Sequence, residues 1–418
     1  MTVPHVQASF FTKEARNVIP ETPFSIPVSV SRDDLSAVIN QVLEESGHKE
    51  FDFLINNHFL QSSLEKFITD QHTPTENVIH IEYVERNPPP TLNQEVRHNE
   101  WVSAVHCSAK LILTGSYDGV VRIWSREGKL LGTAEGHTAP VKDVAWLNPG
   151  ATGDGQLFVS ASQDQTIHMW KYDWLTADVV HLYQCRGHAR SVEAVAPSPD
   201  QSKFSSVSWD KYVKIWSSDP SPGEEAGDDA SVPVKKRKST SKQPKVMTRT
   251  PLVTLAGHTQ PAVTVRWPTE DELLTGGWDH CIRLWDMATG VNKSTLNGSK
   301  VFHDIDQSIA LPHLITSANS DKLVRIWDKR INSGSAVQSF LVSHLGWVVS
   351  VCWSPVREHQ LASGSYDGTV RMWDARSGKV PLYTIMSHEG KVLSLDWSCP
   401  EVIASGGTDN MLRTYSVS

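Results

Sequence analysis

The sequence predicts a mainly β protein in which seven small sheets follow one another in a ring, preceded by a small α+β domain. Seven similar segments, each a strand, a turn with an Asp and a second strand, predict the sheets. Constant offsets between their residues predict that the sheets are equivalent. A stretch over 1–86 lacks the repeat and predicts the separate domain. Residues 1–90 hold 13 acidic and 6 basic residues, which is −7 of the net charge of −8. An acidic domain of this kind is not expected to dock on bare phosphate.

Local patterns predict the elements of the first domain in order. Segments 6–11 (VQASFF) and 23–30 (PFSIPVSV) alternate as strands, and 31–45 has a helical apolar face behind Ser31 as its N-cap. A strand pair is expected over 51–55 and 58–60, a short helix behind a capping box from Ser62 to Glu65, and a last strand over 77–85. The stiff, extended spacer 87–90 (Asn-Pro-Pro-Pro) then ends the domain.

The repeats over 91–418 share four kinds of residue. An aromatic residue follows each turn Asp by six positions, and a Ser or Thr precedes it by four. A Gly-His or Ser-His pair lies upstream of five repeats, and we expect the first and fifth repeats to lack this His. The turn acids are Asp118, Asp164, Asp210, Asp279, Asp321, Asp367 and Asp409, and the histidines are His137, His188, His258, His344 and His388. Because Ser, His and Asp recur in every part of the ring, we interpret them as scaffold and not as a catalytic group.

One interval between turn acids is 69 residues, whereas the others are 42 or 46. The extra residues predict a disordered, charged loop over 217–250 between the last two strands of the third repeat. Acidic residues come first in this loop and a basic run follows, centred on Lys235, Lys236, Arg237 and Lys238. Such a run suits a nuclear import receptor or RNA phosphates, and an ordinary solvated loop is the alternative.

Other features limit the class of protein. The five cysteines are scattered without a Cys-x-x-Cys pair, which argues against a disulfide framework or a zinc site. We expect a protein that is neither secreted nor membrane-spanning, because no leader pattern and no long apolar run occur. Phosphate-binding loops, His-Glu-x-x-His and Gly-x-Ser-x-Gly are absent from the sequence. We therefore expect no enzyme, no cofactor and no metal of its own.

The repeat resembles that of the WD40 family, and the resemblance covers 91–418. It implies a seven-bladed β-propeller in which the His, Ser or Thr, Asp and Trp of each blade form a hydrogen-bonded chain. The last repeat leaves no room for its outer strand, so we expect residues 91–98 to supply that strand and close the ring. The residue before each turn Asp is expected on the binding face, as Tyr117, Trp209, Trp278 and Tyr366. The alternative is that these aromatic residues only pack against the next turn.

The element order of the first domain is that of a ubiquitin-like (β-grasp) fold. Together with the propeller it resembles the ribosome-assembly factors that carry a Notchless-like N-terminal domain. The segments FFTKE, FDFLI and IEYVERNPPP and the lysine-rich loop are most similar to the Ytm-type WD-repeat factors. This resemblance implies a non-catalytic scaffold in maturation of the large (60S) ribosomal subunit and pre-rRNA processing, in the nucleolus and nucleoplasm. An adaptor for a ubiquitin ligase is the alternative.

The same resemblance implies the partners and one sharper site. The partners are pescadillo, the block-of-proliferation WD-repeat protein, a midasin-type AAA ATPase and the pre-60S particle, whereas direct RNA contact stays open. In this family a glutamate before the last β-grasp strand completes the coordination of a metal held by the ATPase. The matching residue is Glu76, in the loop 72–77. A carboxylate oxygen is a ligand that Mg²⁺ prefers, whereas the residue alone would be read as an ordinary solvated Glu.

Overall fold

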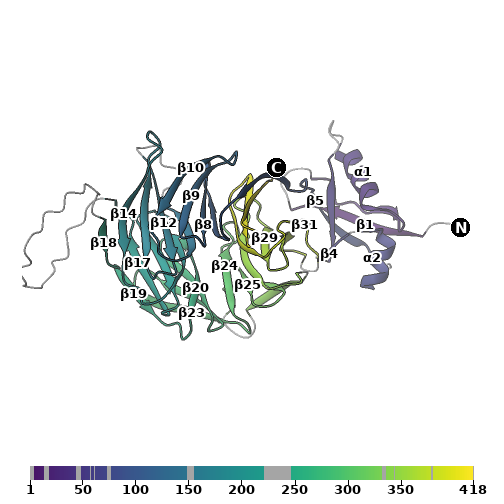
Figure 1. Ribbon diagram of the computed structural model, residues 1–418. Helices are drawn as coiled ribbons and strands as arrows, with labels where there is room; N and C mark the ends of the chain where they lie inside the picture. Colours follow the sequence, from purple (N-terminus) through teal and green to yellow (C-terminus); the bar gives the residue numbers. More distant parts are fainter. Residues whose placement is uncertain are drawn as a thin grey trace, which may run out of the picture.

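The computed structural model describes residues 4–13, 18–43, 49–56, 58–60, 62–72, 77–147, 155–220, 246–331, 336–342, 344–377 and 380–417. A small N-terminal domain lies beside a larger body built from β-sheets (Figure 1). The prediction of a mainly β protein is confirmed. Among the described residues no helix is long and apolar enough to cross a membrane.

The described residues of the N-terminal domain form one five-stranded sheet with two helices. Its strands lie in the order β2-β1-β5-β3-β4, and the neighbours β1 and β5 run parallel. Leu35 and Ile39 of the first helix and Phe67 of the second belong to one buried cluster with sheet residues such as Phe10 and Tyr83. The elements are β1 (His5–Phe11), β2 (Phe24–Pro27), α1 (Arg32–Leu43), β3 (Phe51–Ile55), β4 (His58–Phe59), α2 (Leu64–Gln71) and β5 (Ile79–Glu85). The helices lie on the side of the sheet away from the larger body (Figure 1).

The start of the second helix corrects one prediction. The N-cap of α2 is Ser63, whose hydroxyl accepts from the backbone N–H of Lys66, and not Ser62. The next two amides, of Leu64 and Glu65, donate to the carbonyl oxygens of Val30 and Val28, which follow β2, at 3.0 and 2.7 Å. These contacts fix the first turn of the helix, so the tertiary structure selects one of two adjacent serines that both suit an N-cap.

In the part of the chain that the structure describes, the body has seven sheets, and we number them as ring sheets in chain order. The first has β7 (Val102–Cys107), β8 (Leu111–Ser116), β9 (Val120–Ser125) and β10 (Leu130–Glu135); the second has β11 (Val141–Trp146), β12 (Gln156–Ser162), β13 (Ile167–Tyr172) and β14 (Val179–Cys185); the third has β15 (Val192–Pro197), β16 (Lys203–Ser208), β17 (Tyr212–Ser217) and β19 (Val253–Ala256). The fourth has β20 (Ala262–Thr269), β21 (Glu272–Gly277), β22 (Cys281–Asp286) and β23 (Val291–Asn297); the fifth has β24 (Phe302–Gln307), β25 (Leu314–Asn319), β26 (Leu323–Asp328) and β27 (Val337–Val342). The sixth has β28 (Val348–Trp353), β29 (Gln360–Ser365), β30 (Thr369–Asp374) and β31 (Tyr383–Met386); the seventh has β32 (Val392–Cys399), β33 (Val402–Gly407), β34 (Met411–Ser416) and β6 (Thr91–Arg97).

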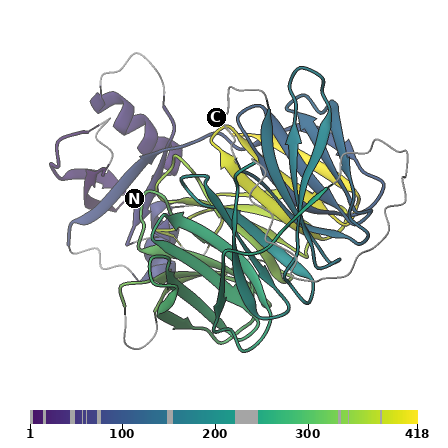
Figure 2. The ribbon, with the colours of Figure 1, turned by 90° about the vertical axis from the view of Figure 1, so that its left-hand side faces the viewer.

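The first strand of each of these sheets contacts the first strand of the next, and β32 contacts β7, so the sheets form a closed ring (Figure 2). The last sheet is completed from far away in the sequence, because β6 pairs antiparallel with β34 from Met411↔Arg97 to Ser416↔Thr91. An ion pair of 2.6 Å between Arg413 and Glu95 crosses the same two strands. The expectation that residues 91–98 supply the outer strand is confirmed by this pairing.

The charged loop needs a correction at its end. Met247–Arg249 form β18, which pairs parallel with β14 and adds a fifth strand to the second ring sheet. The Arg249 guanidinium donates to the carbonyl oxygens of Ser217 and Asp219 at 2.7 Å each and lies 3.9 Å from the centre of the Tyr183 ring. Residues 247–249 are therefore ordered, because they pair with β14. Arg249 also links them to Ser217 and Asp219 at the start of the loop.

Candidate partner-binding face

A repeated polar network fixes the turns at one end of the ring. In five ring sheets the turn Asp bonds to His Nδ1 at 2.8–3.1 Å, and His Nε2 bonds to the Ser or Thr hydroxyl at 2.7–2.8 Å. The Trp indole N–H donates to the same hydroxyl, for example from Trp216 to Ser206 at 2.8 Å. A neutral imidazole that donates from Nδ1 and accepts at Nε2 satisfies this pattern. In the last repeat the hydroxyl of Tyr415 reaches Ser405 through Ser387.

Burial and hydrogen bonding set the charges in this network. Burial by itself would raise the pKa of Asp210, but the hydrogen bond from His188 together with those from the backbone N–H groups of Ala189 and Tyr212 lowers that pKa below its ordinary value. Burial also lowers the pKa of His188, His344 and His388, because a charged imidazole loses its hydration there. The network is therefore an ionised carboxylate held by a neutral histidine at neutral pH.

The first ring sheet corrects another prediction. His98 lies in the expected place, with its Nε2 2.9 Å from the Thr114 hydroxyl, although an Arg and not a Gly or Ser precedes it. The turn acid Asp118 pairs with Arg122 at 2.6 Å instead of with this His. The fifth ring sheet also uses an Arg, since Asp321 pairs with Arg325 at 2.6 Å and Ser317 bonds to Asn319.

Aromatic residues gather in pairs at the end of the ring that carries the turn acids. Trp209 and Trp278 approach to 5.0 Å between ring centres, from the third and fourth ring sheets. Tyr117 pairs with Trp101 at 5.2 Å, and Tyr366 pairs with Trp347 at 5.9 Å. Trp101 and Trp347 were not predicted from the sequence. We call the residues Trp101, Tyr117, Trp209, Trp278, Trp347 and Tyr366 the aromatic face.

A backbone hydrogen bond explains the pairing and supplies the missed signal. In all seven ring sheets the residue before the turn Asp donates its N–H to the carbonyl oxygen of the residue just before the inner strand, at 2.8–3.1 Å. Tyr117 donates to Trp101 in this way, and Tyr366 donates to Trp347. The two positions are always adjacent, so an aromatic residue just before the inner strand belongs to the same face.

The residues of the aromatic face pack against neighbours and are also partly exposed to solvent. Trp101, Trp278 and Trp347 expose 44%, 38% and 50% of their surface, whereas Tyr117, Trp209 and Tyr366 are half-buried. Lys142 lies 5.1 Å from the Tyr117 ring centre and Lys391 lies 4.7 Å from that of Tyr366. The predicted residues therefore pack on neighbours, and each pair also presents an aromatic surface to solvent. That a partner binds there stays a prediction.

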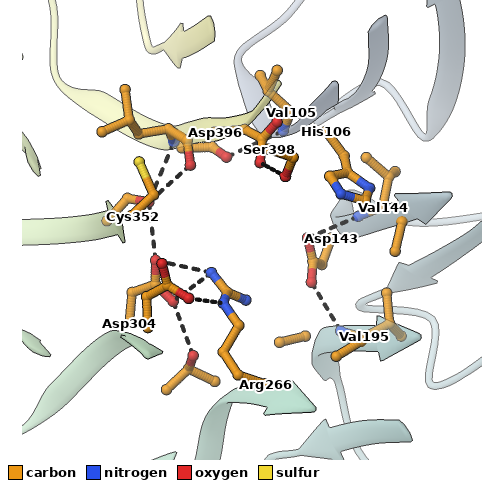
Figure 3. Close-up of a pocket in the computed structure, with 18 of the residues that line it drawn as sticks. Val105, His106, Asp143, Val144, Val195, Arg266, Asp304, Cys352, Asp396 and Ser398 are labelled. Carbon is orange, nitrogen blue, oxygen red and sulfur yellow. Dashed lines mark hydrogen bonds and ion pairs between the residues drawn. The ribbon is translucent and has the colours of Figure 1, made fainter. Parts of the chain in front are cut away.

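A cavity of about 430 Å³ lies between the inner strands of the ring (Figure 3). Its polar side chains join neighbouring ring sheets, because Asp143 accepts from Val195 N–H at 2.8 Å and Asp396 from Cys107 N–H at 2.7 Å. Arg266 pairs with Asp304 at 3.1 Å. Burial raises the pKa of Asp143 to about 7. These bonds assign the acids of the cavity to the scaffold.

Among the described residues, His137, Asp164 and His168 form the group that could hold a metal ion, because their possible ligand atoms all lie within 4.8 Å of one another. Both nitrogens of His137 are already used, by Asp164 at 2.8 Å and by Ser160 at 2.8 Å. The His168 ring stacks on that of His137 at 3.9 Å. A metal here would break the network of the second ring sheet, so these residues also belong to the scaffold.

Two of the predicted sites lie outside the described residues. These are Glu76 and the basic run Lys235, Lys236, Arg237 and Lys238. The described chain ends at His72 on one side of the Glu76 loop and resumes at Asn77, two residues before β5. Both sites stay predictions.

Comparison with known proteins gives matches along the whole chain. A model of the NLE (NUC135) domain matches residues 6–68, and a model of the WD domain, G-beta repeat, matches 91–125, 128–171, 180–217, 249–286, 334–374 and 379–416. A protein of Nematostella vectensis named ribosome biogenesis protein WDR12 homolog is 42% identical over 417 residues, which cover 99% of each chain. Proteins of the same name are 42% identical in Ixodes scapularis, covering 98% of each chain, and 38% identical in Aedes aegypti, covering 98% of this chain and 95% of the relative.

Proposed function

The chain belongs to the WDR12 family of ribosome biogenesis proteins, and from this premise we propose that it is a non-catalytic scaffold for maturation of the large (60S) subunit and for pre-rRNA processing, in the nucleolus and nucleoplasm. The observation that carries the proposal is the aromatic face on a closed ring. Acids of the cavity and of the turns, such as Asp143 and Asp210, are used in hydrogen bonds within the ring, whereas the aromatic pairs present apolar surface outward. Such a body is suited to holding other proteins in place.

We assign the aromatic face to protein partners, of which pescadillo and the block-of-proliferation protein are the proposed ones within a pre-60S particle. Large aromatic side chains on a rigid support bury much surface at little cost in conformational entropy. Trp209 and Trp278 come from different ring sheets, so a single partner residue between them would contact both.

The test of this face is a Trp209→Ala and Trp278→Ala double variant. We expect at least about a tenfold loss of affinity for the partner that binds there, because truncated aromatic anchors lose both area and packing. Recovery of partners with the tagged chain, followed by titration of each purified partner, measures the loss. Unchanged recovery of all partners, or recovery of a ubiquitin ligase in place of pre-60S rRNA and proteins, contradicts the proposal.

We propose that the N-terminal domain is a ubiquitin-like (β-grasp) module that presents Glu76 to a midasin-type AAA ATPase, and that the ring is a seven-bladed propeller. The strand order β2-β1-β5-β3-β4 with parallel central strands supports the first assignment. A projected carboxylate supplies the hard oxygen ligand that a Mg²⁺ ion with one open position accepts. The ATPase would then remove the chain from the particle.

The Glu76→Asp variant tests this contact. The charge stays but the carboxylate is shorter by about one methylene, so we expect about a tenfold or larger loss of ATPase binding. Retention on pre-60S particles should rise in cells that carry the variant. Glu65→Asp, an exposed acid on α2, is the matched control. Normal ATPase binding by the Glu76→Asp protein would refute the ligand role.

We propose further that the basic run from Lys235 to Lys238 serves nuclear import. Arg249 holds together the two ends of the loop that carries this run, because its guanidinium donates to the carbonyl oxygens of Ser217 and Asp219. Replacing all four basic residues by Ala is expected to reduce nuclear accumulation. If accumulation stays normal, RNA contact or simple solvation becomes the better assignment for this run.

A further inference from the structure

The N-terminal domain uses the face of its sheet that no helix covers to contact the ring. On β5 the side chains of Ile81 and Tyr83 belong to the domain core, so Glu82 between them points to the opposite face. That face would be open to solvent in an isolated domain, yet Glu82 is only 5% exposed. Figure 1 shows β5 on the side of the domain that faces the ring.

A buried ion pair joins the two parts at this place. The Glu82 Oε1 atom lies 2.9 Å from Nη1 of Arg376, which follows β30 of the sixth ring sheet. Asp374, which also belongs to the ring, accepts hydrogen bonds from the same guanidinium, at 2.6 Å from Nη2 and 2.9 Å from Nε. Lys13 contacts the second Glu82 oxygen at 3.1 Å, but it belongs to the N-terminal domain and is 62% exposed. Only the contact between Glu82 and Arg376 therefore crosses between the two parts through this carboxylate.

A second contact holds the spacer beside the ion pair. The Tyr383 hydroxyl of β31 donates to the carbonyl oxygen of Asn87, where the spacer begins. A hydrogen bond with Tyr383 also raises the pKa of the neighbouring Arg86. A cleft lined by Asp52 and Val84 of the domain and by His359 and Leu382 of the ring lies around these contacts.

We infer that Glu82 and Arg376 form a latch that fixes the N-terminal domain in one orientation on the sixth ring sheet. The four-residue spacer is the covalent connection, and the Tyr383 contacts hold only its start, at Arg86 and Asn87, so loss of the ion pair would let the domain reorient. With the latch, the domain and the ring behave as one body until the ion pair breaks. Two acids around one fixed guanidinium give the contact a defined geometry as well as attraction.

The use of the latch rests on the proposed function. A motor that pulls on the N-terminal domain would transmit its force through the central strand β5 into the sixth ring sheet, and not through the spacer alone. Because β5 pairs with both β1 and β3, the force would be shared by the whole sheet. Opening of the latch would then precede any strain on β6.

Distance measurements on the full chain without any ATPase test the latch, so their outcome does not depend on whether an ATPase binds. Spin labels go on Gln41→Cys of α1 and Lys322→Cys of the ring, both exposed, in a Cys281→Ser background because the other four cysteines are buried. The unchanged chain should give one narrow distance distribution. Glu82→Gln should give one at least about twofold wider, since it removes the charge while Arg376 keeps Asp374.

Two further variants complete the design. Lys13→Met is the matched control, because it removes the other contact of the same carboxylate within the domain, and its distribution should stay narrow. Arg376→Lys weakens the latch from the ring side, because an ammonium group cannot bind Glu82 and Asp374 in the fixed geometry of a guanidinium. Its distance distribution should also widen, and it replaces Glu82→Gln as the test if that variant fails to fold. Narrow distributions for both Glu82→Gln and Arg376→Lys would overturn the inference.

Discussion

The Ser206 hydroxyl makes two hydrogen bonds in the third ring sheet, since it accepts from the Trp216 indole and donates to His188 Nε2, both at 2.8 Å. Ser206→Ala would leave two buried polar groups without a partner. We expect the free energy of unfolding to fall by about 2–4 kcal/mol, since each such group costs about 1–3 kcal/mol. Chemical denaturation followed by tryptophan fluorescence measures the change.

The control for this prediction is already present in the ring. Thr114 and Thr275 occupy the same position in other ring sheets and accept the same indole bond at 2.9 and 2.8 Å. Ser206→Thr should therefore keep most of the stability that Ser206→Ala loses. Equal losses in the two variants would show that the hydroxyl is not what matters.

Acid should destabilise the chain through its buried histidines. Burial lowers the pKa of His168 to about 2, and in the unfolded chain an ordinary His has a pKa of about 6.5. Between these values the unfolded chain binds more protons, so the stability is full above pH ~6.5 and is lost as the pH falls. Each such His contributes a slope of about 1.4 kcal/mol per pH unit.

Thermal midpoints between pH 8 and pH 5 check this sign. His168→Asn removes one titrating group, and its midpoint should fall less steeply than that of the unchanged chain, each measured relative to its own value at pH 8. The lowered pKa of Asp210 acts in a different window, because the stability it adds is lost only below pH ~4. A midpoint that rises on acidification would contradict the assignment of neutral histidines.

Residue patterns predicted the turn network because its members recur at fixed spacings in the five ring sheets that hold the Asp–His bond. His98 was not predicted because Arg97, and not Gly or Ser, precedes it at the end of β6, the strand that pairs with β34. Trp101 and Trp347 were not predicted because their relation to the turn is a backbone hydrogen bond between distant positions. Sequence spacing alone does not display such a bond.

At the scale of elements, closure of the ring by β6 gives the next prediction. Replacing residues 91–97 by a Gly-Ser segment of equal length should lower the thermal midpoint by about 5 °C or more, because β34 loses its partner and the pair of Glu95 with Arg413 is lost. Leu92→Ser is the control, since Leu92 is 54% exposed on the same strand. A midpoint unaffected by the segment replacement would mean that β6 contributes nothing to closure.

Strand positions followed from alternation, and helix positions followed from apolar periodicity. What alternation did not predict was β18, because Met247–Arg249 is too short and too polar to display a pattern of its own. The strand exists because the edge of β14 is adjacent and Arg249 binds the start of the loop. The choice of Ser63 over Ser62 likewise depends on the end of the β2 segment and not on the helix sequence.

At the scale of the whole molecule, the aromatic face and the N-terminal domain lie at opposite ends of the sixth ring sheet. The turn acid Asp367 precedes β30 and the latch residue Arg376 follows it, so one strand of about 20 Å separates them. This separation could not be predicted from sequence, because the sequence does not show which ring sheet the N-terminal domain contacts. If a partner binds the aromatic face and an ATPase binds the N-terminal domain as proposed, this separation would let both bind at the same time.

We therefore expect the two sites to act independently. The Trp209→Ala and Trp278→Ala double variant should leave ATPase affinity within about threefold of the unchanged chain, and Glu76→Asp should leave partner affinity equally unaffected, because residues this far apart rarely couple. Titrations of each binder in the presence and absence of the other measure the coupling. A strong mutual effect would place the two sites closer than the fold does.

Closure by β6 also has a consequence for synthesis on the ribosome. The strand β6 is translated before every other strand of the ring, and its partner β34 is translated after all of them. In the nascent chain β6 therefore stays without its partner strand while more than 300 further residues are translated. Unpaired strand edges can pair with other chains. Newly made protein would then depend on chaperones until translation finishes, and a truncated product would be a hazard rather than a weaker version of the whole.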